Sequence, residues 1–338
     1  MSKNETRTAL VIGANGGIGS EVSAALLRRG WNIRALVRTA PKPKAHVPRD
    51  RIDWRMGDAM SSDDVLNAAR GVDTIIHAVN PPGYRNWQQL VLPMLDNTIR
   101  AAIVNKARIV LPGTVYNFAP ETLENVTEDS PQHPRTRKGA IRAEMERRLE
   151  NATTNGAKAL IVRAGDYFGA NAGNNWFSQC LVKPGKKVSA ITYPGKAGIG
   201  HQWAYLPDVA ETMARLLDHE TEIEPFALFH MEGHWDHDGT QMINAMQHCV
   251  GRKLSIRRLP WPLINLLRPI SSFCQEASEV RYLWQHGYKM DNHALISILG
   301  EEPRTDLITA VGTSLNALGC IEDVDSYELN ETSRTQTA

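Results

Sequence analysis

Short apolar runs alternate with helix-patterned stretches through the first half of the chain. The apolar runs are TALVIG, NIRALV, IDWRMGD, DTIIHAV, ARIVLPG and ALIVRAG. Between them, EVSAALLRRG and SSDDVLNAARG carry apolar residues at helical spacing, and Gly30 and Gly71 are suited to end these helices. Repeated strand–helix units of this kind predict an α/β fold of the Rossmann type, with a doubly wound parallel sheet.

The regular alternation stops after VRAGDYFG, where the chain becomes rich in Gly and Asn. We therefore predict a dinucleotide-binding Rossmann domain over residues 1–170 and a smaller, mainly substrate-binding domain over residues 171–325. Within the second part, YLPDVAETMARLLD has the pattern of an amphipathic helix capped by Asp208, and residues 201–218 are expected to return to the Rossmann domain. Residues 326–338 form a polar tail.

Charge and composition exclude several classes of partner. Lys plus Arg number 38 and Asp plus Glu number 37, so the chain of 338 residues carries a formal net charge of +1. This balance gives no overall field that would attract nucleic acid or an anionic membrane. No apolar run approaches the roughly 20 residues needed to cross a bilayer, and the first residues lack an apolar targeting segment. We expect a cytoplasmic protein that acts on a small molecule, with pairing of subunits into a homodimer left open.

The residues that could hold a metal do not form a convincing site. The four cysteines are far apart, which argues against a zinc ribbon or a disulfide framework and favours buried thiols. The segment FHMEGHWDHDG holds His230, His234, Asp236 and His237, but it is patterned as a strand and a turn, on which this spacing does not converge on one point. We therefore expect no metal.

A glycine-rich turn follows the first apolar run. Gly13, Gly16 and Gly19 form G-x-x-G-x-x-G between the strand ALVI and a helix that begins near Ile18. The first glycine permits a tight turn, the second admits a pyrophosphate, and the third lets the helix pack close to the strand. Its place in the first strand–helix unit predicts a dinucleotide site formed by Gly13, Asn15, Gly16, Gly17, Ile18 and Gly19.

The end of the second strand indicates which dinucleotide binds. An NAD site usually has an acidic residue there, whereas this chain has Arg38, followed by Lys42 and Lys44. A guanidinium can bind phosphate oxygens with two hydrogen bonds, so NADP is favoured and NAD is the alternative cofactor. Arg38 could instead be an ordinary solvated surface arginine.

Later strand ends point to the same crevice. Asp58 and Ala59 follow the third strand, where Asp58 is placed to meet the adenine amine. Ala78 and Val79 follow the fourth strand with small side chains that could flank the cofactor, and Asn80 could hydrogen-bond to it. Each could also be an ordinary residue at a strand end.

With these residues in place, the chain resembles the extended short-chain dehydrogenase/reductase superfamily, which includes sugar-nucleotide epimerases and dehydratases. The resemblance covers roughly residues 7 to 320 and includes the glycine motif, GDAMSSDDVLNAARGVDTIIHAV, VYN, RAGDYFGA and YLPDVAETM. In that superfamily a Ser or Thr polarises the substrate, and the Tyr of Y-x-x-x-K exchanges the proton. Here Pro112 falls at the serine position, and Lys138 and Arg142 stand in place of the tyrosine and lysine. The resemblance therefore implies an atypical member without the usual triad.

The resemblance also implies residues on the cofactor side. Tyr167 and Phe168 match the segment that lines the nicotinamide, and Arg142 keeps a cation that would face its ribose.

Three residues are candidates to replace the missing acid. Lys138 could donate a proton if Arg142 and a positive nicotinamide lower its pKa, or it could be a surface lysine. Tyr116 and Thr114, expected on one face of the fifth strand, could bind a substrate carbonyl, or could serve packing and strand-end hydrogen bonding.

Three aromatic side chains and one arginine, from two segments, are expected to form the substrate wall, because both segments flank the nicotinamide end in this fold. The residues are Arg85, Trp87, Trp176 and Phe177. The favoured function is an NAD(P)-dependent oxidoreductase or epimerase-like enzyme. The alternative is a non-catalytic NADP-binding sensor or scaffold of the NmrA-like kind.

Overall fold

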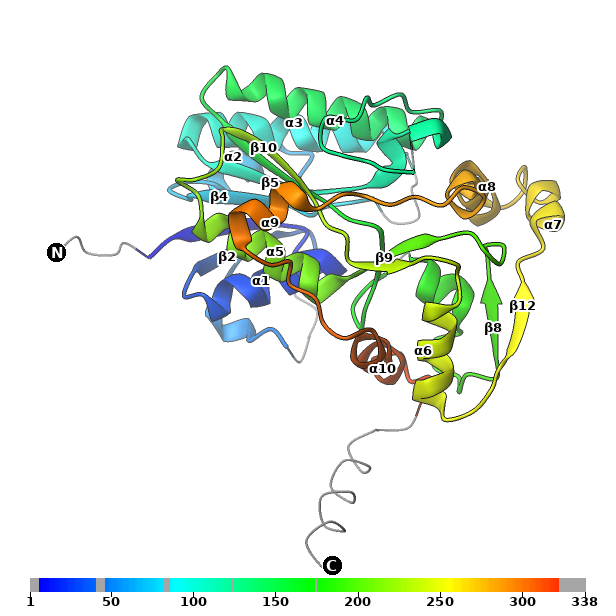
Figure 1. The fold of residues 1–338 in the computed structure, drawn as a ribbon. Coiled ribbons are helices and arrows are strands. Elements are labelled where there is room, and N and C mark those ends of the chain that lie inside the picture. Colours follow the sequence, from blue (N-terminus) through cyan, green and yellow to red (C-terminus); the bar gives the residue numbers. More distant parts are fainter. Residues whose placement is uncertain (1–5, 41–45, 82–85, 123, 174, 322–338) are drawn as a thin grey trace, which may run out of the picture.

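A parallel sheet forms the centre of the molecule. The computed structural model describes residues 6–40, 46–81, 86–122, 124–173 and 175–321. Among these, seven parallel strands join in the order β10-β6-β5-β4-β1-β2-β3 (Figure 1). They are β1 (Thr8–Ile12), β2 (Asn32–Val37), β3 (Ile52–Met56), β4 (Thr74–His77), β5 (Arg108–Gly113), β6 (Lys158–Arg163) and β10 (Phe226–His230). The six predicted strands are confirmed as β1 to β6.

Helices cover both faces of this sheet. The helices α2 (Ser62–Ala68), α3 (Trp87–Asn105) and α4 (Arg137–Thr153) lie on one side, and α1 (Gly17–Arg28) and α5 (Leu206–Asp218) lie on the other (Figure 1). Each side has its own apolar cluster, with Val65 and Leu95 in one and Val22 and Val209 in the other. The doubly wound Rossmann-type fold is therefore confirmed. The strand order reverses between β1 and β4, the place where ligands bind in such sheets.

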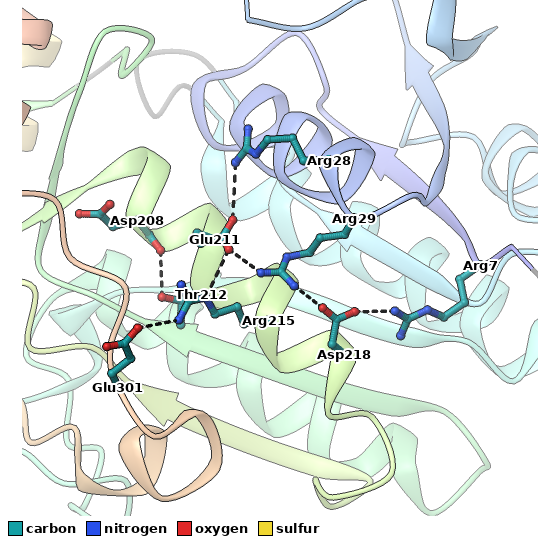
Figure 2. Close-up of polar contacts among 9 residues, drawn as sticks. All are labelled: Arg7, Arg28, Arg29, Asp208, Glu211, Thr212, Arg215, Asp218 and Glu301. Carbon is teal, nitrogen blue, oxygen red and sulfur yellow. Dashed lines mark hydrogen bonds and ion pairs between the residues drawn. The ribbon is translucent and has the colours of Figure 1, made fainter. Parts of the chain in front are cut away.

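We call the seven-stranded sheet and the helices that cover it the Rossmann half of the molecule. Ion pairs join α5 to the rest of this half. Arg29, at the end of α1, pairs with Asp218 and lies 2.5 Å from Glu211, while Arg7 lies 2.5 Å from Asp218 (Figure 2). The predicted capping role of Asp208 is wrong. The helix begins at Leu206, so Asp208 lies within its first turn, and its carboxylate accepts hydrogen bonds from Thr305 at 2.7 and 2.8 Å.

The smaller part of the molecule holds two short sheets and most of the remaining helices. The strands β7 (Asp166–Phe168), β9 (His201–Tyr205) and β11 (His234–Asp236) form one sheet, and β8 (Ala190–Tyr193) pairs with β12 (Ser255–Arg258). Around them lie a π-helical turn, η5 (Phe177–Leu181), the 3₁₀ turn η6 (Arg281–Trp284), and the helices α6 (Gln241–Val250), α7 (Trp261–Leu266), α8 (Ser272–Glu279) and α10 (Leu307–Ala317). Their apolar cluster includes Phe168, Trp203 and Trp284.

The chain returns to the Rossmann half more often than expected. Besides α5, the strand β10 joins the edge of the main sheet and α9 (His293–Leu299) packs beneath it through Leu295. The four cysteines are free thiols, two of them buried and two half-buried. No helix in the described part of the chain combines the length and apolarity needed to span a membrane.

Candidate active site

A cavity of about 1050 Å³ opens at the carboxyl ends of the main sheet and continues toward α8. The glycine-rich loop after β1, the ends of β2 to β5, and the start of α4 contribute to its walls. The predicted cofactor residues that line it are Gly13, Asn15, Gly16, Gly17, Ile18, Arg38, Asp58, Ala59, Ala78, Val79, Asn80, Arg142 and Tyr167.

Three glycines of the loop serve different steric needs. Gly13 has φ +94°, and a Cβ there would lie 2.7 Å from the Ala78 carbonyl oxygen. A Cβ on Gly16 would lie 3.1 Å from the Gly13 oxygen and would approach no other group of the described residues to within 4 Å, so this position adjoins the cavity rather than the core. Gly19 does not line the cavity; it lets α1 approach the loop so closely that a Cβ there would lie 2.4 Å from the Gly13 oxygen.

Within the described part of the chain, no acidic side chain caps the start of α1. Its N-cap is Gly16, which offers no side-chain acceptor, and the first turn holds no acidic residue. Backbone N–H groups and the positive end of the helix dipole therefore remain for an anionic group. These are the features that a pyrophosphate requires.

Arg38 stands at the far end of the cavity, directly after β2. Its side chain is exposed, and among the described residues it has no hydrogen-bond or ion-pair partner. Asp58 follows β3, and its Oδ1 accepts a hydrogen bond from the Met60 N–H at 3.0 Å. Lys42 and Lys44 lie outside the described residues.

The expected placement of Trp87 in the substrate wall is wrong. As the first residue of α3 it turns inward, is buried, and donates from Nε1 to Asn80 Oδ1 at 2.7 Å. The Arg142 guanidinium lies 5.1 Å from the Trp87 ring centre, so Trp87 supports two cavity residues without reaching the cavity. Arg85 lies outside the described residues.

Two phenylalanines are also buried away from the cavity. Phe168 follows Tyr167 on β7, and since neighbouring strand residues point to opposite faces, Tyr167 lines the cavity while Phe168 enters the core. Phe177 is buried against Phe168, with ring centres 5.7 Å apart, whereas the preceding Trp176 lines the cavity. Neither Phe168, predicted at the cofactor, nor Phe177, predicted in the substrate wall, lines the cavity.

Lys138 lies at the second position of α4 and points into the cavity wall. Its side chain is 3% exposed, and its Nζ lies 2.6 Å from Glu276 Oε2 on α8. Burial lowers the pKa of Lys138, opposed by Glu276 and Glu279, while Arg137 lowers it further. The pKa of Lys138 is therefore lowered by burial and by Arg137, and not by Arg142 as expected.

Arg142 lies one helical turn beyond Lys138 and faces the ends of β4 and β5. Its Nη1 donates to the Pro112 carbonyl oxygen at 3.4 Å. Beside it, burial and the Arg142 charge lower the pKa of His77 to about 3, so this imidazole stays neutral. His77 Nδ1 lies 2.9 Å from Thr98 Oγ1, while its buried Nε2 has no partner among the described residues.

Thr114 and Tyr116 lie just beyond β5 rather than on it. Tyr116 belongs to a 3₁₀ turn, η3 (Val115–Asn117), so the alternation expected along a strand does not apply. Both residues line the cavity. Thr114 Oγ1 is buried and lacks a hydrogen-bond partner in the described part of the chain, which leaves it able to bind a ligand.

A buried charge network fixes the backbone at Thr114. Arg163, fully buried, donates to the Thr114 carbonyl oxygen at 2.8 Å, to Glu146 at 2.8 Å and to His230 Nε2 at 3.1 Å. His230 is thus an acceptor for a guanidinium, and His234 packs 5.9 Å from the Phe168 ring centre. Among the described residues, no group of three or more His, Cys, Asp or Glu side chains could hold a metal ion.

Two acidic residues of the cavity escaped the sequence analysis. Asp166 begins β7 and accepts a hydrogen bond from His201 Nε2 at 2.8 Å, and Glu276 is the partner of Lys138. Asp166 lies in RAGDYFGA, close to a strand end, and this position is the sequence signal that indicates it. Glu276 gave no signal, because its partner is far away in the sequence.

Comparison with known proteins identifies a family. A model of the NAD dependent epimerase/dehydratase family matches residues 9–229. The curated sterol-4-alpha-carboxylate 3-dehydrogenase, decarboxylating, of Mus musculus is 27% identical over 137 residues, which cover 38% of this chain and 36% of that protein. The protein of the same name from Homo sapiens is 26% identical over 138 residues, covering 39% and 35%. The chain thus spans about a third of the length of these relatives.

Solved structures share the fold over nearly the whole chain. The UDP-glucose 4-epimerase of Thermus thermophilus, in complex with NAD, is 19% identical, with a TM-score of 0.69 over 92% of this chain and 98% of that one. MoeE5 in complex with UDP-glucose and NAD is 18% identical, with a TM-score of 0.70 and the same coverage. At these identities the similarity concerns the fold.

Proposed function

The chain belongs to the NAD dependent epimerase/dehydratase family, and we propose that it is an NADP-dependent oxidoreductase or epimerase-like enzyme acting on a small molecule. The observation that carries this proposal is the uncapped start of α1 and its glycine loop, which open into a cavity shared with Thr114 and Lys138. When bound, the dinucleotide would exchange a hydride at nicotinamide C4 with a carbonyl or alcohol of the substrate.

The cofactor-side residues divide by the group that each would bind. Gly16 and the first N–H groups of α1 would hold the pyrophosphate, and Arg142 the nicotinamide ribose. Arg38 supports NADP over NAD, because an exposed guanidinium without a partner in the described part of the chain is free for a 2′-phosphate. Asp58 would accept a hydrogen bond from the adenine amine.

The substrate-side residues supply a hydrogen bond and a proton. Thr114 Oγ1 would donate a hydrogen bond to the substrate carbonyl oxygen. This role is supported because the buried Oγ1 has no hydrogen-bond partner in the described part of the chain. In the direction of reduction, the Lys138 ammonium would deliver the proton that this oxygen takes up, and burial favours that transfer by lowering the lysine pKa. Tyr116 is the second candidate for the same step.

The wall beyond these residues bears on the kind of substrate. Trp176, Ala277 and Val280 line it, which favours a substrate with an apolar body next to its reacting carbon. Two carboxylates, Asp166 and Glu276, also line the cavity and would disfavour a strongly anionic group beside them.

One observation favours a second function, that of a cofactor-binding sensor or scaffold. Lys138 is buried and held by Glu276 at 2.6 Å, an arrangement that a purely structural lysine would also show. In that case the dinucleotide would bind and no substrate would be turned over.

An absorbance assay of NADPH consumption separates these two functions. We expect the protein to oxidise NADPH with at least one member of a panel of cyclic and aromatic ketones and aldehydes. The variant Thr114→Val should retain NADPH binding while turnover falls by about 10² or more, the usual scale for losing such a donor. NADPH binding without turnover across the panel would contradict the enzyme proposal and support the sensor.

A further inference from the structure

Large apolar side chains are exposed along the segment of the chain that holds β12 and α7. Ile256, Leu263, Leu266 and Ile270 are 53%, 50%, 74% and 80% exposed, and we call these four residues the α7 patch. They belong to one continuous segment that runs from β12 through α7, at the outer margin of the smaller part of the molecule (Figure 1). Exposed apolar groups gathered in this way mark an interaction surface more often than isolated ones do.

The inner face of α7 explains why the outer face is not needed for folding. Trp261 and Ile264 are buried, and Trp261 Nε1 donates to the Pro194 carbonyl oxygen at 2.8 Å. Leu263 and Leu266, three residues apart, project from the other side. The helix is therefore anchored by its buried side chains, while its leucines remain available to a partner.

The same segment carries an excess of positive charge. Residues 251–275 contain five cationic residues and no acidic one, in a chain whose net charge is only +1. The five are exposed, namely Arg252, Lys253, Arg257, Arg258 and Arg268. No acidic side chain of the described residues pairs with Arg257, Arg258 or Arg268, so their charges are not neutralised within that part of the chain.

We propose that the α7 patch and its five cations dock on the surface of an anionic membrane. Aliphatic side chains flanked by arginines fit a bilayer surface, since the former enter the acyl boundary and the latter bind lipid phosphates. The exposed apolar residues of the patch are all aliphatic, which disfavours single-stranded nucleic acid because stacking needs aromatic rings. Our expectation of no membrane partner rested on the net charge of the whole chain, which hides this local asymmetry.

The position of the patch gives this docking a use. Asn265 of α7 lies 3.0 Å, oxygen to oxygen, from the Ser278 hydroxyl of α8, and Ile264 shares an apolar cluster with Ala277. Ala277 and its neighbour Glu276 also line the cavity. The helices α7 and α8 therefore lie between the docking surface and the cavity, so an apolar compound dissolved in the bilayer would lie close to it.

Sedimentation with lipid vesicles tests the proposal without any assay of activity. The full-length protein is mixed with vesicles of phosphatidylcholine, alone or with roughly one third phosphatidylserine, at about 0.1 M salt, where charges act over about 10 Å. We expect at least about tenfold tighter binding to the anionic vesicles, weakening as salt is raised. Leu266→Asp with Ile270→Asp should reduce this binding by about tenfold or more, and so should Arg257→Ser with Arg258→Ser.

A matched control and a folding check keep the result clear. Val104→Asp places one such aspartate at a residue that is 68% exposed on α3, away from the patch, and it should bind vesicles like the parent. All variants should keep the parent circular dichroism spectrum. Equal binding to both kinds of vesicle, or no binding, would overturn the proposal. A parent dimer that Leu266→Asp converts to a monomer, without vesicle binding, would overturn it in favour of a contact between two copies of the chain.

Discussion

The Lys138 ammonium and the Glu276 carboxylate meet at 2.6 Å in the wall of the cavity, joining α4 of the Rossmann half to α8 of the smaller part. A second contact supports the first, since Glu279 Oε1 accepts a hydrogen bond from the Lys138 backbone N–H at 2.8 Å. The residue at the position of the family's tyrosine is therefore a buried cation with a half-buried carboxylate beside it.

We predict that Lys138→Met lowers turnover by about 10² or more, while the affinity for NADPH changes little, because the ammonium acts on the substrate oxygen. The same change removes the nearer of the two cations at the half-buried Glu276, which keeps Arg137 at 3.3 Å, so the free energy of unfolding should fall by about 1–3 kcal/mol. Steady-state kinetics and urea unfolding measure the two effects.

The double variant Lys138→Met with Glu276→Gln separates catalysis from stability. It also removes the carboxylate charge that lost its nearer cation, so it should regain most of the lost unfolding free energy and none of the turnover. Tyr116→Phe is the companion control for the second candidate acid. A large loss in Tyr116→Phe beside an active Lys138→Met would assign the proton transfer to Tyr116.

Two glycines of one loop should respond differently to the same substitution. Gly16→Val should abolish dinucleotide binding with a nearly unchanged circular dichroism spectrum, since a Cβ there would face the pyrophosphate space and only approach the Gly13 oxygen to 3.1 Å. Gly19→Val should instead lower the melting temperature, because a Cβ there would lie 2.4 Å from the same oxygen. Unchanged nucleotide affinity in Gly16→Val would show that the phosphate loop lies elsewhere.

Acid should destabilise the protein through its buried histidines. Burial lowers the pKa of His77 and of His230 to about 3 in the folded protein. In the unfolded chain each imidazole takes up a proton as the pH falls below about 6.5. Above pH 6.5 the imidazoles are neutral in both states and the protein keeps its full stability. Between pH 6.5 and about 3 only the unfolded chain takes up the protons, so the free energy of unfolding falls by at most about 1.4 kcal/mol per pH unit for each histidine.

Urea unfolding of the parent and of His77→Asn at several pH values between about 6.5 and 4.5 measures this loss. The variant should show a shallower dependence of the unfolding free energy on pH, because one of the histidines that take up a proton on unfolding is gone. Parallel curves for the two proteins would mean that His77 does not stay neutral in the folded state.

The features that could be predicted from the sequence are those set by residues close together in the chain. The strands β1 to β6 are apolar runs bounded by turn residues, and the loop at Gly13 needs a positive φ that favours glycine, so both could be recognised locally. β10 was missed as a member of the main sheet, because FALFH follows an irregular stretch and nothing in it indicates pairing with β6.

Errors arose where the direction of a side chain depends on the exact start of an element. Trp87 and Phe177 were expected in the substrate wall, but each begins a helical element and points into the core. Phe168 and Tyr167 are neighbours on β7 and point to opposite faces. A shift of one residue in the strand would exchange which of the two faces the cavity. Glu276 could not be found at all, since its role depends on a contact between distant parts of the chain.

The central claim is that the cavity binds NADP and that Arg38 recognises its 2′-phosphate. Calorimetric titration with NADPH and with NADH tests this claim most directly. We predict that NADPH binds at least about tenfold tighter than NADH, a difference of about 1.4 kcal/mol, and that Arg38→Ala removes this preference while leaving NADH binding unchanged. Arg28→Ala, which removes an exposed arginine at the end of α1, is the matched control and should keep the preference. Equal affinities for the two nucleotides, or a preference that survives Arg38→Ala, would contradict the account.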